Sequence, residues 1–353
     1  MNTLTIPAFS AEAAEAAQRR LDNLAKVPRS LGRIEELAVR LAGITGKECP
    51  AFPEKSVVLF AADHDIALQG VSATGQEVTE MQVRNFVKGG GTINAFCRNA
   101  GAQLSVVDVG VKNDLDDVEG LVRRKVMHAA RDFSEGPAMT REEAERAILT
   151  GVELVGELKE QGYRLLATGE MGIGNTTTSS AVAAVLLGQP VEGMTGRGAG
   201  LSDEGLARKI DAIHRGIAKN QPDSADALDV LAKLGGFDIA GLCGIFLGGA
   251  LEGVPVLADG FISCVAALCA VRLCPAAAKA VFASHYSTEP AAKLVLDALN
   301  KKALITAGLH LGEGTGAVAA IPLWDMALAV YDGCYSFEEG GIEAYTPQGG
   351  AGC

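Results

Sequence analysis

The sequence predicts an α/β fold, in which a mainly parallel, Rossmann-like sheet is covered by helices on both faces and a smaller helical part is added. From Ser56 onward, short apolar runs that end in polar or glycine-rich residues alternate with helical patterns, which is typical of parallel sheets. Hydrophobic residues make up 48% of the 353 residues, enough for a large core. Aromatic residues contribute 5% and glycine 43 residues, so we expect an aliphatic core with close backbone approaches.

Two helices are expected before the sheet. The segment from Ser10 to Lys26 is rich in Ala, Glu and Arg and ends before Pro28, and a second helix carries Leu37 and Leu41 on one face. Residues 1–50 are therefore predicted to be N-terminal helices, residues 54–315 a large α/β domain, and residues 316–353 a C-terminal helical segment and tail. The two end segments are expected to pack together as a small helical domain.

Six apolar runs are the candidate strands: SVVLFAADHD, QLSVVDVGV, YRLLATGEMG, VPVLADGF, KAVFASHYS and KALITAGLHL. Between them, Thr140 and Glu143 form a capping-box pair before one helix, and Ser202 precedes another. Because ligands of parallel sheets bind beyond the carboxyl ends of the strands, the loops that follow these runs are the candidate binding segments.

The net charge of −12 argues against a general binder of nucleic acid or of a membrane surface, but it leaves room for a phosphorylated small molecule. The N-terminus has no signal-peptide pattern, and the uncharged stretches are shorter than the roughly 18 residues that span a bilayer. The eight cysteines form no CxxC motif. We therefore expect reduced, buried thiols in a cytoplasmic protein and no zinc site.

A glycine-rich segment, 169–178, follows one candidate strand and opens a helix. Its backbone N–H groups and the helix N-terminus suit an anion, although a simple tight turn remains an alternative. The segment is neither GxGxxG nor GxxxxGK[ST], which disfavours a dinucleotide fold or a P-loop. A second segment, 195–200, precedes a helix with Arg208 and Lys209 and would also suit a phosphate, unless these cations are merely solvated.

Two further loops carry acidic residues. Glu313 lies between glycines after the run ALITAGLHL, where it is expected at a strand's carboxyl end as a general base with a raised pKa, or else as a turn residue. The Asp63-His64-Asp65 segment invites a metal hypothesis, but no second cluster completes a ligand set. Hydrogen bonding at a strand end is the interpretation that we favour, and no metal is expected.

Several segments occur in one order along nearly the whole chain: PRSLGRIEELAVRLAG, AADHDIALQGVSA, EVTEMQV, NFVKGGGTINAF, GEMGIGNTTT, KNQPDSADALDVLAKLGGFDIAGLCG, VLADGFIS, SHYSTEP and LHLGEGTGA. Together they resemble the nicotinate-nucleotide–dimethylbenzimidazole phosphoribosyltransferases, which act in assembling the lower ligand of cobalamin. The resemblance implies a glycosyltransferase (pentosyltransferase) that converts nicotinate mononucleotide and 5,6-dimethylbenzimidazole into α-ribazole 5′-phosphate and nicotinate.

The resemblance also implies roles for individual residues. Glu313 matches the catalytic glutamate of the family. The base-binding residues correspond to Thr74, Gln82, Met171 and Leu311. The phosphate- and ribose-binding residues correspond to Glu170, Gly172, Ile173, Gly174, Asn175, Thr176, Gly196, Arg197, Gly198, Lys209, Asp259, Gly260 and Ser287. Asp65 departs from the family, whose motif usually reads DHG, and Thr74 stands at a variable position, so the preferred base is left open.

The chemistry agrees with these residues. Nicotinate leaves as a neutral pyridine nitrogen and needs no general acid, so the enzyme has to activate the incoming base, as a carboxylate at Glu313 would do, with inversion at C1′. Glu170, if ionised, is a hypothesis for stabilising positive charge on the ribose. No cofactor is expected, the partners are the small-molecule substrates, and the family implies a homodimer.

Three other functions are alternatives. A nucleosidase or glycoside hydrolase would use Glu170 and Glu313 as a carboxylate pair and would release nicotinate without an acceptor. A nucleotide- or corrinoid-binding module would keep the pocket without catalysis, which the intact LGEGTGA segment disfavours. An oxidoreductase is disfavoured because no GxGxxG opens a strand–helix unit.

Overall fold

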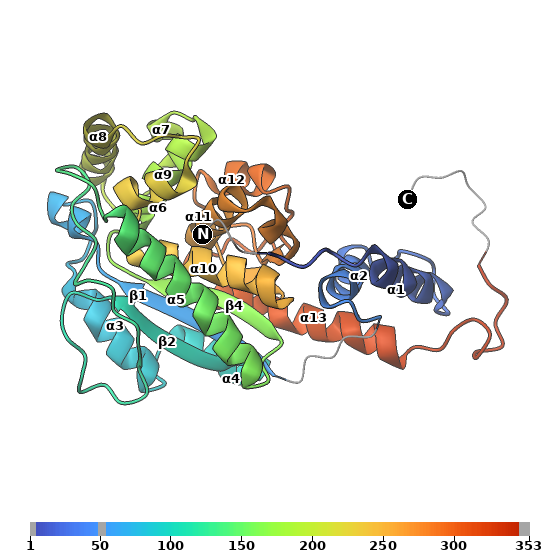
Figure 1. The fold of residues 1–353 in the computed structure, drawn as a ribbon. Helices are drawn as coiled ribbons and strands as arrows, with labels where there is room; N and C mark the ends of the chain where they lie inside the picture. The colour runs from blue at the N-terminus through green and yellow to red at the C-terminus, as the bar shows by residue number, and fades with distance from the viewer. Residues whose placement is uncertain (1–4, 49–53, 346–353) are drawn as a thin grey trace.

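The sheet is six-stranded in the computed structural model, which describes residues 5–48 and 54–345 (Figure 1). The strand order is β3-β2-β1-β4-β5-β6, and every neighbouring pair is parallel. The strands are β1 Lys55–Ala62, β2 Gln103–Gly110, β3 Val122–Arg123, β4 Leu165–Met171, β5 Val256–Ala258 and β6 Val281–Ala283. The predicted parallel α/β sheet is thereby confirmed.

Helices cover both faces of the sheet, as predicted. They are α1 Ala11–Asn23, α2 Arg33–Thr45, α3 Glu77–Val87, α4 Thr92–Ala100, α5 Arg141–Glu160, α6 Asn175–Leu187, α7 Val191–Met194, α8 Asp203–Asn220, α9 Ala227–Leu234, α10 Phe237–Glu252, α11 Phe261–Leu273, α12 Ala292–Ala298 and α13 Thr315–Gly333, with 3₁₀ turns at Asp65–Gln69 and Pro275–Lys279. The capping box of Thr140 and Glu143 forms at the start of α5, and Ser202 caps α8.

Strand β1 shows how the two halves of the core are divided. Val58 and Phe60 point into the cluster beneath α5, α6, α10 and α11, whereas Val57 and Leu59 point into the cluster with α13. Some glycines are explained by helix contacts: a Cβ on Gly244 of α10 would lie 1.9 Å from the carbonyl oxygen of Ile148 in α5. The aliphatic core with close backbone approaches is therefore confirmed.

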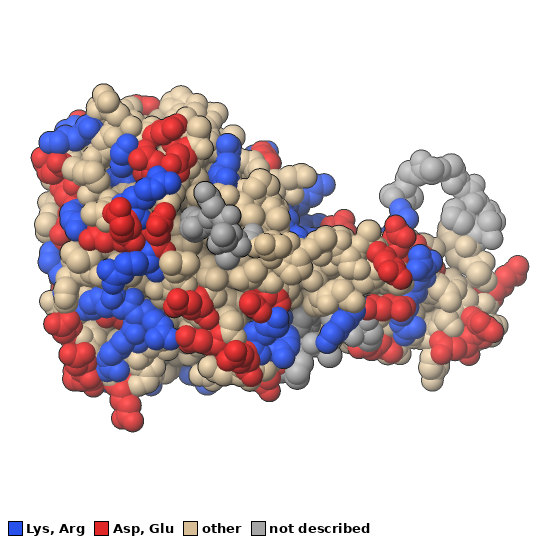
Figure 2. Space-filling view, in the orientation of Figure 1, with Lys and Arg blue, Asp and Glu red and all other residues tan. Residues whose placement is uncertain are grey.

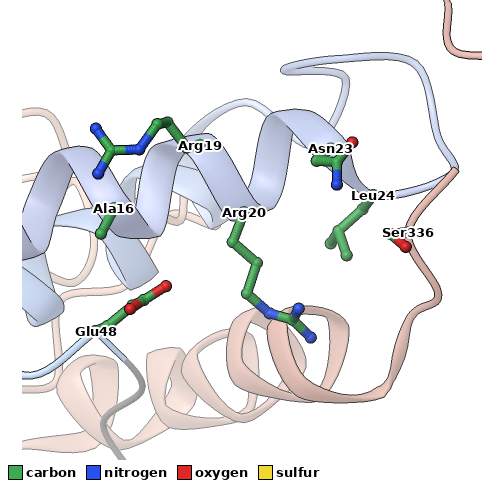
Figure 3. A pocket seen from close by; sticks show the side chains of 7 residues that line it. All are labelled: Ala16, Arg19, Arg20, Asn23, Leu24, Glu48 and Ser336. Carbon is green, nitrogen blue, oxygen red and sulfur yellow. The ribbon is translucent and has the colours of Figure 1, made fainter. Parts of the chain in front are cut away.

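Helices α1 and α2 pack against the C-terminal half of α13 and project from the sheet (Figure 1). In this helical arm, Arg20 points from α1 toward α13 (Figure 3), donates to the carbonyl oxygen of Tyr331 at 2.9 Å and lies over its ring. A cavity of about 380 Å³ beside Arg20 lies remote from the strand ends. The terminal helices thus pack together, while the division into domains stays a prediction.

Two predictions about local structure are wrong. The run KALITAGLHL forms no strand, because its backbone pairs with residues 283–286 only at Leu304 and Ile305 and then turns at Gly308, where φ is +68°. The sixth strand is instead β3, a two-residue strand that pairs with Val107 and Asp108 of β2. The first helix is also shorter than predicted, because Leu24 leaves it to form an extended bridge with Ser336.

The surface carries charges of both signs. On the face shown in Figure 2, Lys and Arg side chains are interspersed with Asp and Glu side chains over the sheet-containing body. In the described ranges, no helix is both long enough and apolar enough to cross a membrane.

Candidate functional site

A cavity of about 720 Å³ opens at the carboxyl edge of the sheet, among the loops that follow β4, β5 and β6 and the loop before α13. Most of the residues that the family resemblance singled out line it. These are Gln82, Glu170, Met171, Gly172, Ile173, Asn175, Thr176, Gly198, Asp259, Gly260, Ser287, Leu311 and Glu313. Loops far apart in the sequence therefore meet where ligands of parallel sheets bind.

Five of the predicted residues lie outside this lining: Thr74, Gly174, Gly196, Arg197 and Lys209. Thr74 is exposed in the loop before α3, and Gly174 caps α6 with φ +104°. Arg197 is turned away from the cavity, because its guanidinium pairs with Asp203 and donates to the carbonyl oxygen of Leu201 at 2.9 Å.

Lys209 is fully buried one layer behind the cavity wall. Its Nζ donates to Thr176 Oγ1 at 2.8 Å and to the carbonyl oxygen of Gly196 at 3.1 Å. Burial lowers the pKa of Lys209 to about 8, and the nearby Glu289 opposes this shift. The ammonium thus fixes the start of α6 and the 196–198 loop together and lends positive charge to both.

The glycine-rich loop after β4 places the N-terminus of α6 at the cavity. Asn175 and Thr176, the first residues of that helix, line the cavity, and the N–H of Ile173 donates to Thr79 Oγ1 at 3.1 Å. A helix N-terminus carries partial positive charge and free N–H donors, so this end of the cavity suits an anion.

Glu170, at the end of β4, is buried among polar partners. Its Oε2 accepts from Asn175 Nδ2, and its Oε1 lies 3.4 Å from the backbone nitrogen of Glu313. Burial raises the pKa of Glu170 to about 8, with smaller contributions from the charges of Asp238 and Asp259. The carboxyl group is therefore held in place, and its charge changes near neutral pH.

Glu313 has a different setting. The prediction that Glu313 lies at the carboxyl end of a strand is wrong, because it lies in the turn before α13. Its own φ is +61°, and the φ values of its neighbours Gly312 and Gly314 are +85° and +89°. Within the described residues its Oε2 is buried without a hydrogen-bond partner. Burial raises the pKa of Glu313, a hydrogen bond from the backbone N–H of Ile93 opposes this shift, and the charge of Asp259 adds to it. Such a carboxylate is available as a base.

Asp259 holds the Glu313 turn. Its Oδ2 accepts from the backbone nitrogen of Gly314 at 3.1 Å, and its Oδ1 accepts from that of Ala317 at 2.9 Å. The carboxylate therefore caps α13 from the loop after β5. Both of its oxygens accept from the protein backbone, in addition to any contact with a sugar.

Sequence reasoning missed several lining residues, including Ser263, His285, Glu289 and His310. His285 and Glu289 belong to the SHYSTEP segment directly after a candidate strand, so their position was a usable signal. No group of three or more His, Cys, Asp or Glu side chains in the described ranges is placed to hold a metal ion. His64 of the Asp-His-Asp segment instead lies against Asp238, 3.1 Å away.

Comparisons with known proteins agree with this geometry. A phosphoribosyltransferase family model matches residues 6–342. The nicotinate-nucleotide–dimethylbenzimidazole phosphoribosyltransferase of Acetivibrio thermocellus is 48% identical over 337 residues, 96% of each chain, and that of Chloroflexus aggregans is 50% identical over 331 residues, 94% of each chain. The crystal structure of CobT from Thermus thermophilus superposes with a TM-score of 0.90 at 43% identity, covering 94% of this chain and 99% of that one.

Proposed function

The chain belongs to the nicotinate-nucleotide–dimethylbenzimidazole phosphoribosyltransferase family, and from this premise we propose how its cavity carries out the transfer. The reaction moves the phosphoribosyl group of nicotinate mononucleotide onto 5,6-dimethylbenzimidazole, giving α-ribazole 5′-phosphate and nicotinate, in cobalamin lower-ligand assembly. Glu313 carries the proposal, because its carboxylate has a free buried oxygen within the described residues and faces the same cavity as the N-terminus of α6.

The 5′-phosphate is proposed to bind where α6 begins. The backbone of residues 172–176 and the loop at Gly198 line that end of the cavity, and the buried Lys209 supplies positive charge from behind. Binding at this point fixes C1′ relative to the acceptor and so converts binding energy into orientation. Arg197 is the weakest of the assigned residues, because reaching a phosphate would require it to leave Asp203.

The acceptor is proposed to lie between Glu313 and a pocket formed by Gln82, Met171 and Leu311. Glu313 takes the N–H proton of the benzimidazole, and the other ring nitrogen of the benzimidazole attacks C1′. The new C1′–N bond forms as the bond to nicotinate breaks, and the electron pair stays on the departing ring nitrogen. Attack opposite the leaving group converts a β-linkage into an α-linkage.

Glu170 is proposed to stabilise positive charge on the ribose when it is ionised. Its carboxyl group lies between the start of α6 and the turn of Glu313, which is the position between the two proposed substrate sites. Charge stabilisation of this kind strengthens in a site that excludes water. Glu170→Gln with unchanged turnover would remove this role and leave that of Glu313 standing.

We also propose that the enzyme is a homodimer and acts in the cytoplasm. The helical arm projects from the sheet (Figure 1) and exposes apolar side chains, among them Val27, Met326 and Tyr335, which a second copy could cover. A cytoplasmic location fits a substrate that carries a phosphate and does not cross membranes unaided.

The test is product analysis with nicotinate mononucleotide and a panel of aromatic bases. We expect nicotinate release to require a base and the product to have the α configuration. Release of nicotinate at the same rate without any base would indicate a hydrolase instead. Binding of both substrates without product would indicate a binding protein.

A further inference from the structure

A line of buried polar side chains runs beneath the glycine-rich loop, from His64 after β1 to Glu170 at the end of β4. His64 and Asp238 are fully buried, and His64 Nε2 lies 3.1 Å from Asp238 Oδ1. Asn175 Nδ2 lies 3.2 Å from Asp238 Oδ2 and also donates to Glu170 Oε2. The two protons of one amide nitrogen thus connect two carboxyl groups.

The surrounding backbone is shaped around His64. A Cβ on Gly236 would lie 2.1 Å from His64 Cε1, and one on Gly172 would lie 3.0 Å from His64 Nε2. A Cβ on Gly174 would lie 3.1 Å from the Cβ of His64. The imidazole therefore fills a space that glycines of two different loops leave open, directly below the cavity residues 172–176.

Asp238 is the charged neighbour of the buried His64 ring. Neither ring nitrogen of His64 meets a well-aligned hydrogen-bond partner within the described residues, so Asp238 at 3.1 Å supplies its electrostatic contact. Asp238 Oδ1 also accepts from the backbone nitrogen of Ile239 at 2.8 Å. Its two oxygens are thereby fixed in direction, one toward His64 and one toward Asn175. Removing one member of this line would leave the polar group of another member buried without its partner, which costs free energy. The positions of His64, Asp238 and Asn175 therefore depend on one another.

We propose that His64 and Asp238 are positioning residues for Glu170, acting through the side-chain amide of Asn175. His64 fixes Asp238, Asp238 fixes Asn175, and Asn175 keeps the carboxyl group of Glu170 aimed at the ribose part of the cavity. The proposal rests on the proposed role of Glu170. It assigns a function to two residues that do not line the cavity.

The test is a double-mutant cycle with kinetics of both substrates. His64→Leu removes the polar ring, and we expect kcat to fall by about 10-fold, which corresponds to about 1.4 kcal/mol of lost transition-state stabilisation. KM for nicotinate mononucleotide should stay within about two-fold, because the phosphate is proposed to bind the backbone of residues 172–176, whereas this line runs through the side chain of Asn175. His64→Gln should restore most of kcat, since its amide can again reach Asp238.

In a Glu170→Gln background, His64→Leu should cause no further loss of kcat. Losses that multiply would overturn the proposal, because His64 would then act independently of Glu170. Equal losses in His64→Leu and His64→Gln would overturn it as well. A Glu170→Gln enzyme with full activity would instead remove the proposed role of Glu170 itself, so the two failures are distinguishable.

Asp238→Asn provides a second variant, should His64→Leu fail to fold. Glu170 is faced by the charges of Asp238 from α10 and of Asp259 from the loop after β5, and by the backbone nitrogen of Glu313 from the turn before α13. Removing the Asp238 charge takes away one cause of the raised pKa of Glu170. The part of the rising limb of kcat that is lost in a Glu170→Gln background, and that is therefore separate from the part due to Glu313, should move to lower pH. A limb that stays in place would overturn the link between Asp238 and Glu170.

Discussion

The two carboxyl groups of the cavity, Glu170 and Glu313, lie in contrasting surroundings. Glu170 is surrounded by fixed partners: the amide of Asn175, the backbone of Glu313 and the carboxylate of Asp238 behind them. Glu313 has a free Oε2 within the described residues and a left-handed backbone, and its neighbour Leu311 is 57% exposed. On the Glu170 side the carboxyl group itself is held by hydrogen bonds. On the Glu313 side Asp259 holds the backbone of the turn, and the carboxylate keeps one oxygen free within the described residues.

This contrast fits the two substrates. The ribose phosphate is the same in every reaction, so buried polar contacts can preorganise its site without narrowing the range of acceptors that the enzyme uses. An aromatic acceptor varies more, and a pocket with exposed apolar side chains can adjust to it. Backbone strain at Glu313 is then stored on the side where proton transfer takes place. The variants below disturb one side at a time.

Glu313→Gln should have the largest effect. The amide cannot accept the proton, so kcat should fall by about 10²- to 10⁴-fold, the usual scale for a general base. KM for the nucleotide and the thermal unfolding midpoint should stay close to those of the wild type. Because burial raises the pKa of Glu313, the rise of wild-type kcat with pH should occur at a higher pH than it would with a solvated glutamate as the base. A mutant rate near wild type would make Glu313 structural.

Gly169→Ala should disturb Glu313 without changing any charge. The added Cβ would lie 2.6 Å from the backbone oxygen of Glu313, so the turn has to move. A displacement of about 1 Å at a reacting group can cost about 10²-fold in rate, and we expect kcat to fall on this scale.

Gly156→Ala is the matched control for that substitution. Gly156 lies within α5, and an added Cβ would meet no described atom within 4 Å. Alanine there should leave kcat unchanged and stabilise the protein by about 0.5–1 kcal/mol in chemical denaturation. If both alanine variants kept full activity, the contact between β4 and the Glu313 turn would not control the reaction.

Lys209→Met tests the Glu170 side. Loss of a buried cation near the phosphate should raise KM for the nucleotide about 10-fold or more, with a smaller change in kcat. Because burial lowers the pKa of Lys209 to about 8, the wild-type ammonium is charged below that pH and neutral above it. Wild-type kcat/KM for the nucleotide should therefore decline as pH rises through about 8, and Lys209→Met should flatten that decline.

Lys219→Met on the same helix is the control, since Lys219 is exposed and lies 3.9 Å from an exposed Glu135. We expect neither its KM nor its pH profile to change. A similar rise in KM for both variants would point to the overall charge of α8 rather than to the contact between Lys209 and Thr176.

Much of the fold could be predicted from the sequence because the strands of a buried parallel sheet are continuous apolar runs. Five of the six predicted runs contain a strand. The failures have tertiary causes. β3 exists only through its pairing with β2, and KALITAGLHL is apolar although it forms the irregular wall of the cavity. Hydrophobicity alone did not distinguish these two situations.

The site could be predicted in part, because loops after strands converge at one edge of the sheet. The resemblance placed Glu170, Asn175 and Glu313 in one cavity, and the structure brings them there. What remained hidden depends on contacts between distant segments. Examples are the burial of Lys209 behind Thr176 and the pairing of His64 with Asp238. No local pattern indicates which polar side chain turns inward.

Asp65→Gly should have the smallest effect, on the Glu313 side of the cavity. Asp65 Oδ1 accepts from Gln76 Nε2 at 3.0 Å and from Lys112 Nζ at 2.9 Å, and Gln76 directly precedes α3, the helix that carries Gln82. Asp65 stands where the family motif usually has glycine. Its contacts connect the start of α3, beside the proposed acceptor pocket, with Lys112 in the loop after β2. The ion pair of Asp65 and Lys112 is partly exposed, so its loss should change KM for the base only about two- to five-fold. The measurement is steady-state kinetics at low salt, in which KM for the nucleotide should stay unchanged. Lys112→Met should shift KM for the base in the same direction; a shift in nucleotide KM instead would place this contact on the Glu170 side.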